Sequence, residues 1–170
     1  GKSVSLSDFK GKTVVLEWFC PSCPFSGRSS GRSIHSTGRV KALLKNMKEV
    51  DPDAVYLLID SSTKKMRVSP EELSKMDAEA AKKLGITAPI LIDGDTSVAK
   101  AYGAKTTPHM FIIAPDGNLI YQGAIDSIKS PRSSDISSAT NYVAEALDAH
   151  MAGKEVPNPI TKPYGCGVKY

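Results

Sequence analysis

Hydrophobic residues in this chain fall into short runs separated by stretches with helical spacing. Four runs, rich in β-branched and aromatic side chains, predict strands. They cover residues 13–19, 54–60, 89–93 and 109–114. A turn at 115–118 then leads into a fifth run at 119–122, which predicts an antiparallel hairpin.

Between these runs, apolar residues recur at helical spacing and predict helices over residues 40–50, 70–84, 98–102 and 135–151. The second helix has the clearest boundaries. Ser69 is suited to cap it, Pro70 to occupy its first position and Gly85 to end it. The irregular, Ser- and Gly-rich stretch at 25–38 predicts a loop before the first helix.

Strands that alternate with helices and end in a hairpin and a last helix predict an α/β fold. We expect a mixed central sheet with helices on both faces and with the strand at 13–19 in its centre. The domain is expected to span 1–153. The Pro-rich segment 154–170 is expected to form an irregular C-terminal tail packed on it.

Composition narrows the class of protein without adding a function. The chain has 170 residues, 41% hydrophobic and 24% charged, as expected for one globular domain. No apolar run is long enough to span a bilayer, and a net charge of +4 is too small to indicate nucleic-acid binding. The chain opens at Gly1-Lys2 as a processed product would, which favours an extracytoplasmic compartment such as a bacterial periplasm.

The candidate chemistry lies in Cys20-Pro21-Ser22-Cys23, directly after the first predicted strand. Two intervening residues allow the two sulfurs to approach one another, so that one thiol can resolve a mixed disulfide formed on the other. If a helix begins at Pro21 or Pro24, its N-terminal field would lower the pKa of the preceding cysteine. A structural disulfide or half of a zinc site is the alternative, although a zinc site needs two further ligands and the remaining Cys and His residues are scattered.

A second element is Thr106-Thr107-Pro108-His109, immediately before a buried-looking strand. Proline cannot donate to a sheet ladder and so belongs at the edge of a strand, and an X-Pro bond can adopt the cis form. We therefore predict a fixed turn at Pro108.

These features, together with several short motifs along the chain, resemble the thioredoxin-like superfamily. The entry at 1–12 resembles the alkyl-hydroperoxide-reductase and thiol-specific-antioxidant (redoxin) branch. The resemblance to bacterial redoxin-domain proteins rests on Leu16-Glu17-Trp18, Cys23-Pro24-Phe25, Ala101-Tyr102-Gly103-Ala104, Thr106-Thr107-Pro108-His109-Met110, Asn141-Tyr142-Val143 and the stretch 162–170.

The resemblance implies a thioredoxin-like fold in which a cis Pro108 faces the cysteines and Thr107 offers its backbone to an incoming thiol partner. It leaves two choices of nucleophile. In a dithiol frame Cys20 attacks and Cys23 resolves. In frames anchored on Glu17, or on the peroxiredoxin pattern, Cys23 attacks. Leu16 stands where that pattern has proline, which weakens a peroxidase interpretation.

Six other residues carry open alternatives. Glu17 is either a buried acid that relays protons to the thiol or an outward-facing side chain. His109 is a solvated side chain, a residue that tunes the thiolate, or a copper ligand together with Cys20 and Cys23. Cys166 is a second resolving thiol or an unpaired residue. The arginines at 28, 32 and 39 are expected to lie on a solvated loop, with an acidic partner as the lesser alternative.

The leading hypothesis is a thiol-disulfide oxidoreductase that acts through Cys20 and Cys23 without a cofactor or metal. Its partners would be protein thiols or disulfides, or a small thiol reductant, and its state a monomer or weak homodimer. The alternatives are a thiol peroxidase centred on Cys23, with Cys166 or Cys20 resolving, and a copper-binding protein that uses Cys20, Cys23 and His109.

Overall fold

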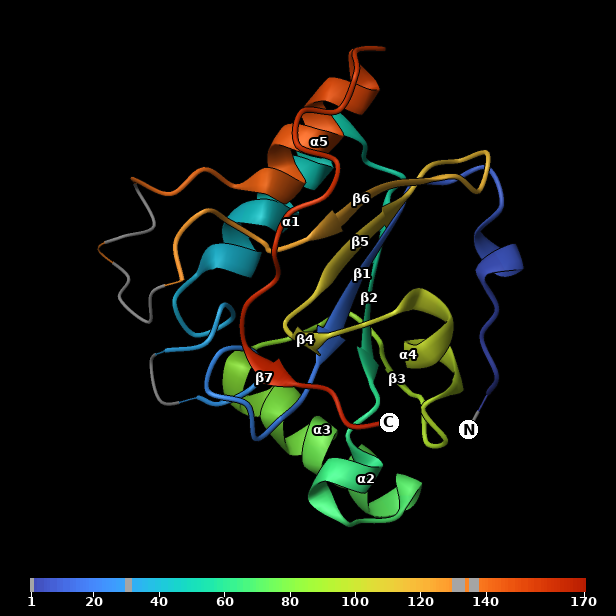
Figure 1. Cartoon of the computed structure of the whole chain (residues 1–170), viewed down its shortest axis with the longest axis vertical. Helices are drawn as coiled ribbons and strands as arrows, with labels where there is room; N and C mark the ends of the chain where they lie inside the picture. Colours follow the sequence, from blue (N-terminus) through green and yellow to red (C-terminus); the bar gives the residue numbers. More distant parts are fainter. Residues whose placement is uncertain (1, 30–31, 130–133, 135–137) are drawn as a thin grey trace.

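A computed structural model of the chain describes residues 2–29, 32–129, 134 and 138–170 (Figure 1). The described part contains seven strands and five α-helices, which follow a short 3₁₀ turn at Leu6–Phe9. The strands are β1 (Val14–Phe19), β2 (Val55–Asp60), β3 (Ile90–Ile92), β4 (Thr106–Thr107), β5 (Met110–Ile113), β6 (Leu119–Gly123) and β7 (Cys166–Gly167). The helices are α1 (Arg39–Val50), α2 (Thr63–Met66), α3 (Pro70–Leu84), α4 (Ser97–Tyr102) and α5 (Tyr142–Met151).

Five strands form the main sheet in the order β3-β2-β1-β5-β6, with β1 in the centre as predicted. β1 pairs in parallel with β2 and antiparallel with β5, and β5 and β6 form the predicted hairpin. The sheet is therefore mixed. Because β1 and β2 are parallel, their carboxyl ends meet at one edge, and the cysteines follow β1 at that edge.

Alternate side chains of the central strands serve two separate cores, one on each face of the sheet. Val15 and Phe19 of β1 pack with α1 and α5, which lie together on one face (Figure 1). Leu16 and Trp18 pack on the other face against Ala99 of α4. The mixed α/β fold with helices on both faces is confirmed.

Helix boundaries follow the capping chemistry where it is strong. Ser69 and Glu72 form a reciprocal capping box at the start of α3, and Gly85 ends this helix in a left-handed conformation, as predicted. The last helix was predicted to start at residue 135, but among the described residues it starts later. α5 begins at Tyr142 because the Asn141 side chain accepts a hydrogen bond from the Ala144 N–H and caps it there. Residues 135–137 lie outside the described residues.

The segment after the cysteines also differs from expectation. No helix begins at Pro21 or Pro24 in the described residues, and α1 starts only at Arg39. Residues 20–29 instead make an isolated turn in which the amides of Ser26, Gly27 and Arg28 donate to the Cys23 carbonyl. The expected field of a helix N-terminus is thus replaced by individual hydrogen bonds around the thiol.

The C-terminal segment follows a path across the domain. From α5 it returns along β6, where the Thr161 amide donates to Gln122, and then crosses to β4 (Figure 1). There β7 forms a second, two-stranded antiparallel sheet with β4. Near the C-terminus, the Tyr170 hydroxyl donates to the Ala104 carbonyl. The segment 154–170 is thereby attached to the domain at several points.

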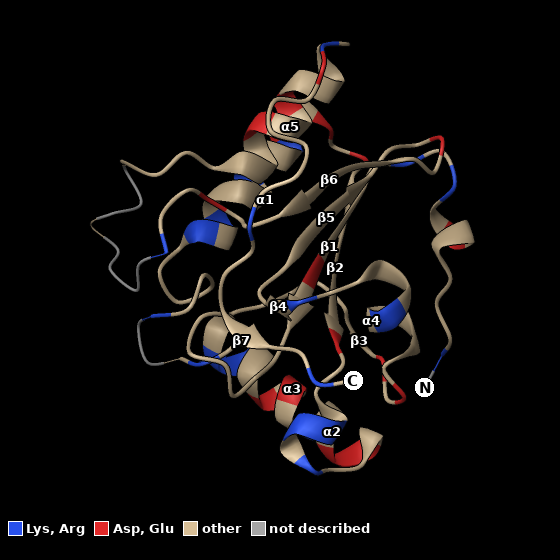
Figure 2. Cartoon of the chain, viewed as in Figure 1, with Lys and Arg blue, Asp and Glu red and all other residues tan. Residues whose placement is uncertain are grey.

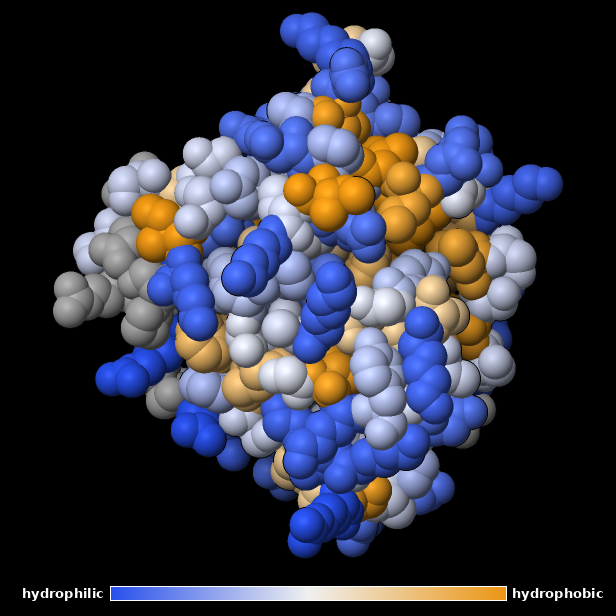
Figure 3. Space-filling model, viewed as in Figure 1, coloured by the Kyte–Doolittle hydropathy of each residue, from blue (hydrophilic) through white to orange (hydrophobic). Residues whose placement is uncertain are grey.

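Charged groups of both signs are interspersed over the helices and loops, in keeping with the small net charge (Figure 2). Hydrophilic side chains are also spread over the face that carries β7 (Figure 3). Among the described residues, no helix is long and apolar enough to cross a membrane.

Two buried carboxyl groups face each other where β2 meets α3. Burial raises the pKa of Asp60 to about 6, and burial followed by the negative charge of Asp60 raises the pKa of Asp77 to about 9. The folded protein therefore holds more protons here than the unfolded chain between about pH 4 and pH 9. This pair stabilises the fold less as the pH rises through that window.

We expect Asp77→Asn to raise the free energy of unfolding by roughly 1–3 kcal/mol at pH 8.5 and by much less at pH 5, because the amide cannot ionise. Urea unfolding at both pH values measures the difference. Glu79→Gln, on an exposed position of the same helix, is the matched control and should show no such pH dependence. An equal effect of Asp77→Asn at both pH values would contradict the charged-pair explanation.

Candidate active site

Cys23 lies in the turn that follows β1, with only 1% of its surface exposed. Its thiol donates a hydrogen bond to the carbonyl oxygen of Thr107 on β4, with a distance of 3.0 Å between sulfur and oxygen. The Thr107–Pro108 peptide bond is cis, as the resemblance to thioredoxin-like proteins implies. The structure thus brings Cys23, Thr107 and Pro108 together at one edge of the sheet.

β7 places the third cysteine beside the same site. Cys166 is the register partner of Thr107, and Gly167 that of Thr106, while the Val168 amide donates to the Lys105 carbonyl. Gly165 has φ +139° and passes so close to the Thr107 carbonyl that a Cβ atom there would overlap it. This close approach brings the Cys166 thiol near Cys23, and each thiol shifts the pKa of the other.

The two thiols of this pair differ in acidity. Burial alone would raise the pKa of Cys23, but hydrogen bonding by the side chains of Thr107 and Cys166 and by the backbone at Phe25 and Cys166 outweighs it and lowers the pKa. Burial, the hydrogen bond to Cys23 and the charge of Cys23 raise the pKa of Cys166 to about 11. Cys23 is therefore the thiol that more readily becomes a thiolate, the form in which a thiol attacks.

Cys20, at the start of the same turn, is fully buried. Its sulfur is 3.3 Å from the Ser22 hydroxyl, and it lines a small cavity together with Thr107, Lys65 and Gly167. Among the described residues, Cys166 is the cysteine that shifts the pKa of Cys23. The three cysteines thus share one region, in which the pKa values of Cys23 and Cys166 depend on one another.

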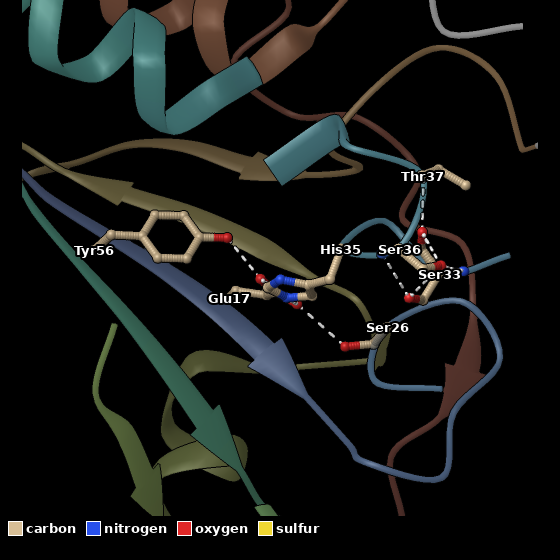
Figure 4. Close-up of polar contacts among 7 residues, drawn as sticks. All are labelled: Glu17, Ser26, Ser33, His35, Ser36, Thr37 and Tyr56. Atoms are coloured by element: carbon tan, nitrogen blue, oxygen red, sulfur yellow. Dashed lines mark hydrogen bonds and ion pairs between the residues drawn. The ribbon is translucent and has the colours of Figure 1, made fainter. Parts of the chain in front are cut away.

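Glu17 occupies the centre of a buried polar cluster beneath the Cys23 turn (Figure 4). Its carboxylate accepts hydrogen bonds from Ser26 Oγ at 3.1 Å and from Tyr56 Oη at 2.6 Å, and both its oxygens lie 3.0 Å from His35 Nε2. Burial, and then the charge and hydrogen bond of Glu17, raise the pKa of Tyr56 well above its usual value. Of the two alternatives for Glu17, a buried acid or an outward-facing side chain, the structure shows the buried acid. Its link to Cys23 passes through Ser26, whose amide donates to the Cys23 carbonyl.

A second buried network anchors the tail just before Cys166. Arg39 Nε donates to Asp126 Oδ2 at 2.6 Å, and the Tyr164 hydroxyl donates to Asp126 Oδ1 at 2.7 Å. Arg39 is only 2% exposed, so the expectation that all three arginines lie on a solvated loop was wrong for this one, although Arg28 and Arg32 are exposed. A side chain at the start of α1 therefore helps to fix the position of β7.

His109 is neither solvated nor placed to bind a metal with the cysteines. Its ring is 3% exposed, stacks on Phe111 with 4.3 Å between ring centroids, and accepts a hydrogen bond from the Lys105 amide. Burial, and then the charge of Lys105, lower its pKa to about 4. Within the described ranges, no group of three His, Cys, Asp or Glu residues is arranged to hold a metal ion. The copper-binding alternative therefore finds no support in this geometry.

A protein-family model named Redoxin matches residues 1–143. The chain belongs to the redoxin family. This redoxin is similar to the crystal structure of a hypothetical protein from Sinorhizobium meliloti 1021, with 24% identity, a TM-score of 0.73 and coverage of 100% of this chain and 86% of that chain. An uncharacterized conserved protein from Geobacillus kaustophilus has 28% identity and a TM-score of 0.70, with coverage of 100% and 84%.

StoA from Bacillus subtilis is a more distant match, at 15% identity and a TM-score of 0.52, with coverage of 81% of this redoxin and 88% of StoA. No curated protein matches the sequence. The family and the sheet order together confirm the thioredoxin-like fold, and the family gives this redoxin a redox function.

Sequence reasoning missed part of the site. Ser26 is the last residue of Cys23-Pro24-Phe25-Ser26, which is the active turn in the frame anchored on Glu17. Its place in that turn could have suggested that it lies near the acid. Tyr56 and His35 had no such signal. Tyr56 reads as an ordinary strand residue, and His35 lies in an irregular segment whose path cannot be derived from hydrophobic periodicity.

Proposed function

We propose that this redoxin is a thiol-disulfide oxidoreductase in which Cys23 attacks and Cys166 resolves. The observation that carries the proposal is the position of Cys166, which lies opposite Thr107 in the β4–β7 pairing while the Cys23 thiol donates to the Thr107 carbonyl. The lowered pKa of Cys23 and the raised pKa of Cys166 support it. The proposal moves the resolving role from Cys20, the partner in the Cys20-Pro21-Ser22-Cys23 motif, to the C-terminal segment.

The reaction proceeds in two exchange steps. The Cys23 thiolate attacks one sulfur of a substrate disulfide, forms a mixed disulfide and releases the first substrate thiolate, which takes up a proton. Cys166 loses its proton and attacks the Cys23 sulfur, which forms the Cys23–Cys166 disulfide and releases the second substrate thiol. The substrate gains two electrons and the protein loses them. A dithiol reductant, protein or small molecule, returns the protein to its starting state.

The local backbone supports the first step. The hydrogen bonds from Thr107, Phe25 and Cys166 stabilise negative charge on the Cys23 sulfur. Because Cys23 is 1% exposed, substrate reaches its sulfur only after a local movement, and we infer that β7, which pairs with β4 beside it, is the segment that moves. The segment that holds the resolving thiol therefore also controls access to the attacking thiol.

A thiol peroxidase is the second candidate, favoured by the separation in sequence between an attacking Cys23 and a resolving Cys166. The Cys23 thiolate would attack hydrogen peroxide, forming a sulfenic acid and releasing hydroxide, and the Cys166 thiol would condense with it to give the disulfide and water. Leu16 and Cys20 depart from the peroxiredoxin pattern at two positions, so we place this activity second. An extracytoplasmic compartment and protein thiols as partners remain predictions.

The first test of the mechanism is a single-turnover reaction of the reduced protein with hydroxyethyl disulfide, quenched with acid and mapped by mass spectrometry. Cys166→Ser should accumulate a stable mixed disulfide on Cys23, because the second step is lost. Cys20→Ser should pass through that intermediate as the wild type does. If Cys166→Ser releases both substrate thiols at the wild-type rate while Cys20→Ser traps the intermediate, the proposed resolving role belongs to Cys20. A parallel reaction with hydrogen peroxide that is faster by tenfold or more would place the peroxidase first.

A further inference from the structure

The second exchange step requires negative charge on Cys166, whose thiol is held in its protonated form in the resting protein. Four features raise its pKa there, namely burial, the charge of Cys20, and the hydrogen bonding and charge of Cys23. The last two depend on a free Cys23 sulfur, and they disappear once that sulfur is bonded to substrate. The remaining influences on Cys166 are its burial and the charges around it.

One cation stands in position to act on that charge. Lys65 lies in α2, and its ammonium nitrogen is buried with no hydrogen-bond acceptor within reach among the described residues. The side chain lines the small cavity that also contains Cys20, Thr107 and Gly167, the residue after Cys166. Its charge acts on both Cys166 and Asp60. A buried ammonium without a partner is costly, and a thiolate formed nearby would compensate it.

We propose that Lys65 is a positioning residue for the resolving step, which stabilises the Cys166 thiolate while Cys23 is held in a mixed disulfide. This inference rests on the proposed function and assigns a role within it to a residue outside the cysteine motifs. Lys65 acts through Cys166 and takes no part in bond formation. It has little effect on the first step, in which Cys166 remains a thiol.

The charged and titratable groups around this point come from four elements and set the pH dependence. Cys20 and Cys23 face Cys166 from the turn after β1, and Cys20 opposes formation of its thiolate. Asp60, at the end of β2, raises the pKa of Asp77 of α3, and the positive charge of Lys65 lowers the pKa of Asp60. Lys169, on the tail, lines the same cavity. Removal of Lys65 should therefore shift the pH profile of resolution upward without abolishing the reaction.

The test measures the lifetime of the mixed disulfide on Cys23 after rapid mixing with hydroxyethyl disulfide, between pH 6 and pH 10. Lys65→Met should slow its resolution about tenfold at pH 7 and move the midpoint of the pH profile up by about one unit, since one pKa unit corresponds to a tenfold change in thiolate fraction. The first step should change less than twofold. Lys65→Arg should restore most of the rate. Lys64→Met, at an exposed position in the same helix, is the matched control and should behave as the wild type.

Two outcomes would overturn the role of Lys65. One is a wild-type resolution rate and pH profile for Lys65→Met. The other is equal slowing of both steps, which would place its effect on Cys23 or on folding. Lys65→Gln removes the charge and keeps a polar side chain, so it provides the same comparison if Lys65→Met folds poorly. Cys166→Ser tells failure of the proposed function apart from failure of the role of Lys65. If the proposed function is wrong, this variant traps no mixed disulfide on Cys23.

Discussion

Replacement of Cys23 by serine is expected to abolish disulfide reduction, with a loss of roughly 1,000-fold or more in the second-order rate constant. Serine can fill the space of the thiol and donate to the Thr107 carbonyl, so the fold should be preserved. Its hydroxyl does not ionise near neutral pH, so the four hydrogen bonds that stabilise a Cys23 thiolate have no anion to act on. Release of thiols from hydroxyethyl disulfide, measured with a fixed excess of reductant, gives the rate.

Cys20→Ser is the natural comparison, because Cys20 lies three residues earlier, is equally buried and has no contact role in the proposed exchange. We expect it to retain at least a third of the wild-type rate. The account would be contradicted if Cys20→Ser lost activity to the same extent as Cys23→Ser, since both members of the motif would then be required for turnover.

Gly165→Ala is expected to have the second largest effect, through displacement of β7. An alanine Cβ would overlap the Thr107 carbonyl, and φ +139° is a conformation that residues with a side chain rarely adopt. Both effects oppose the close approach that brings Cys166 to Cys23. We expect formation of the Cys23–Cys166 disulfide to slow by roughly 10-fold to 100-fold, and alkylation of Cys23 by iodoacetamide to become faster as β7 uncovers it.

Gly167→Ala provides a control two residues further along the C-terminal segment, at the second residue of β7. A Cβ there meets no other atom within 4 Å, and its backbone requires no left-handed conformation. It should leave both rates within twofold of the wild type. If Gly165→Ala also left both rates unchanged, the pairing of β7 with β4 would not be what brings the two thiols together.

The arrangement of the main sheet could be predicted from the sequence because its signals are local and agree with one another. Each strand of the sheet is a short run of β-branched or aromatic residues, and α3 has a cap, a first-position proline and a terminating glycine in order. The position of β1 in the centre follows from its apolar character on both faces. Such features require only neighbours along the chain.

The pairing of thiols could not be predicted in the same way. The spacing of Cys20 and Cys23 suggested that they act together. Cys23 and Cys166 lie 143 residues apart in the sequence, and their proximity depends on where the tail crosses β4. Only Gly165 gave a local hint, because a glycine beside a cysteine permits close approach of the backbone. The tail contains no periodic pattern from which its path could be derived.

The surroundings of the other polar residues were hidden for a similar reason. Arg39 follows a loop rich in serine and glycine, where solvent exposure is the ordinary expectation, and its buried contact with Asp126 depends on the packing of α1 beside the end of the hairpin. His109 follows the cis proline and turns into the core instead of toward the cysteines. In each case a long-range contact decided the position of a polar side chain.

The central claim is that Cys23 and Cys166 form the redox-active pair, and a redox titration tests it most directly. The wild-type protein is equilibrated in glutathione buffers of graded potential, its free thiols are alkylated, and its disulfides are mapped by peptide mass spectrometry. We predict a reversible Cys23–Cys166 disulfide that appears with a single midpoint, while Cys20 remains a thiol. A reversible Cys20–Cys23 disulfide in the same titration, with Cys166 alkylated throughout, would contradict the account.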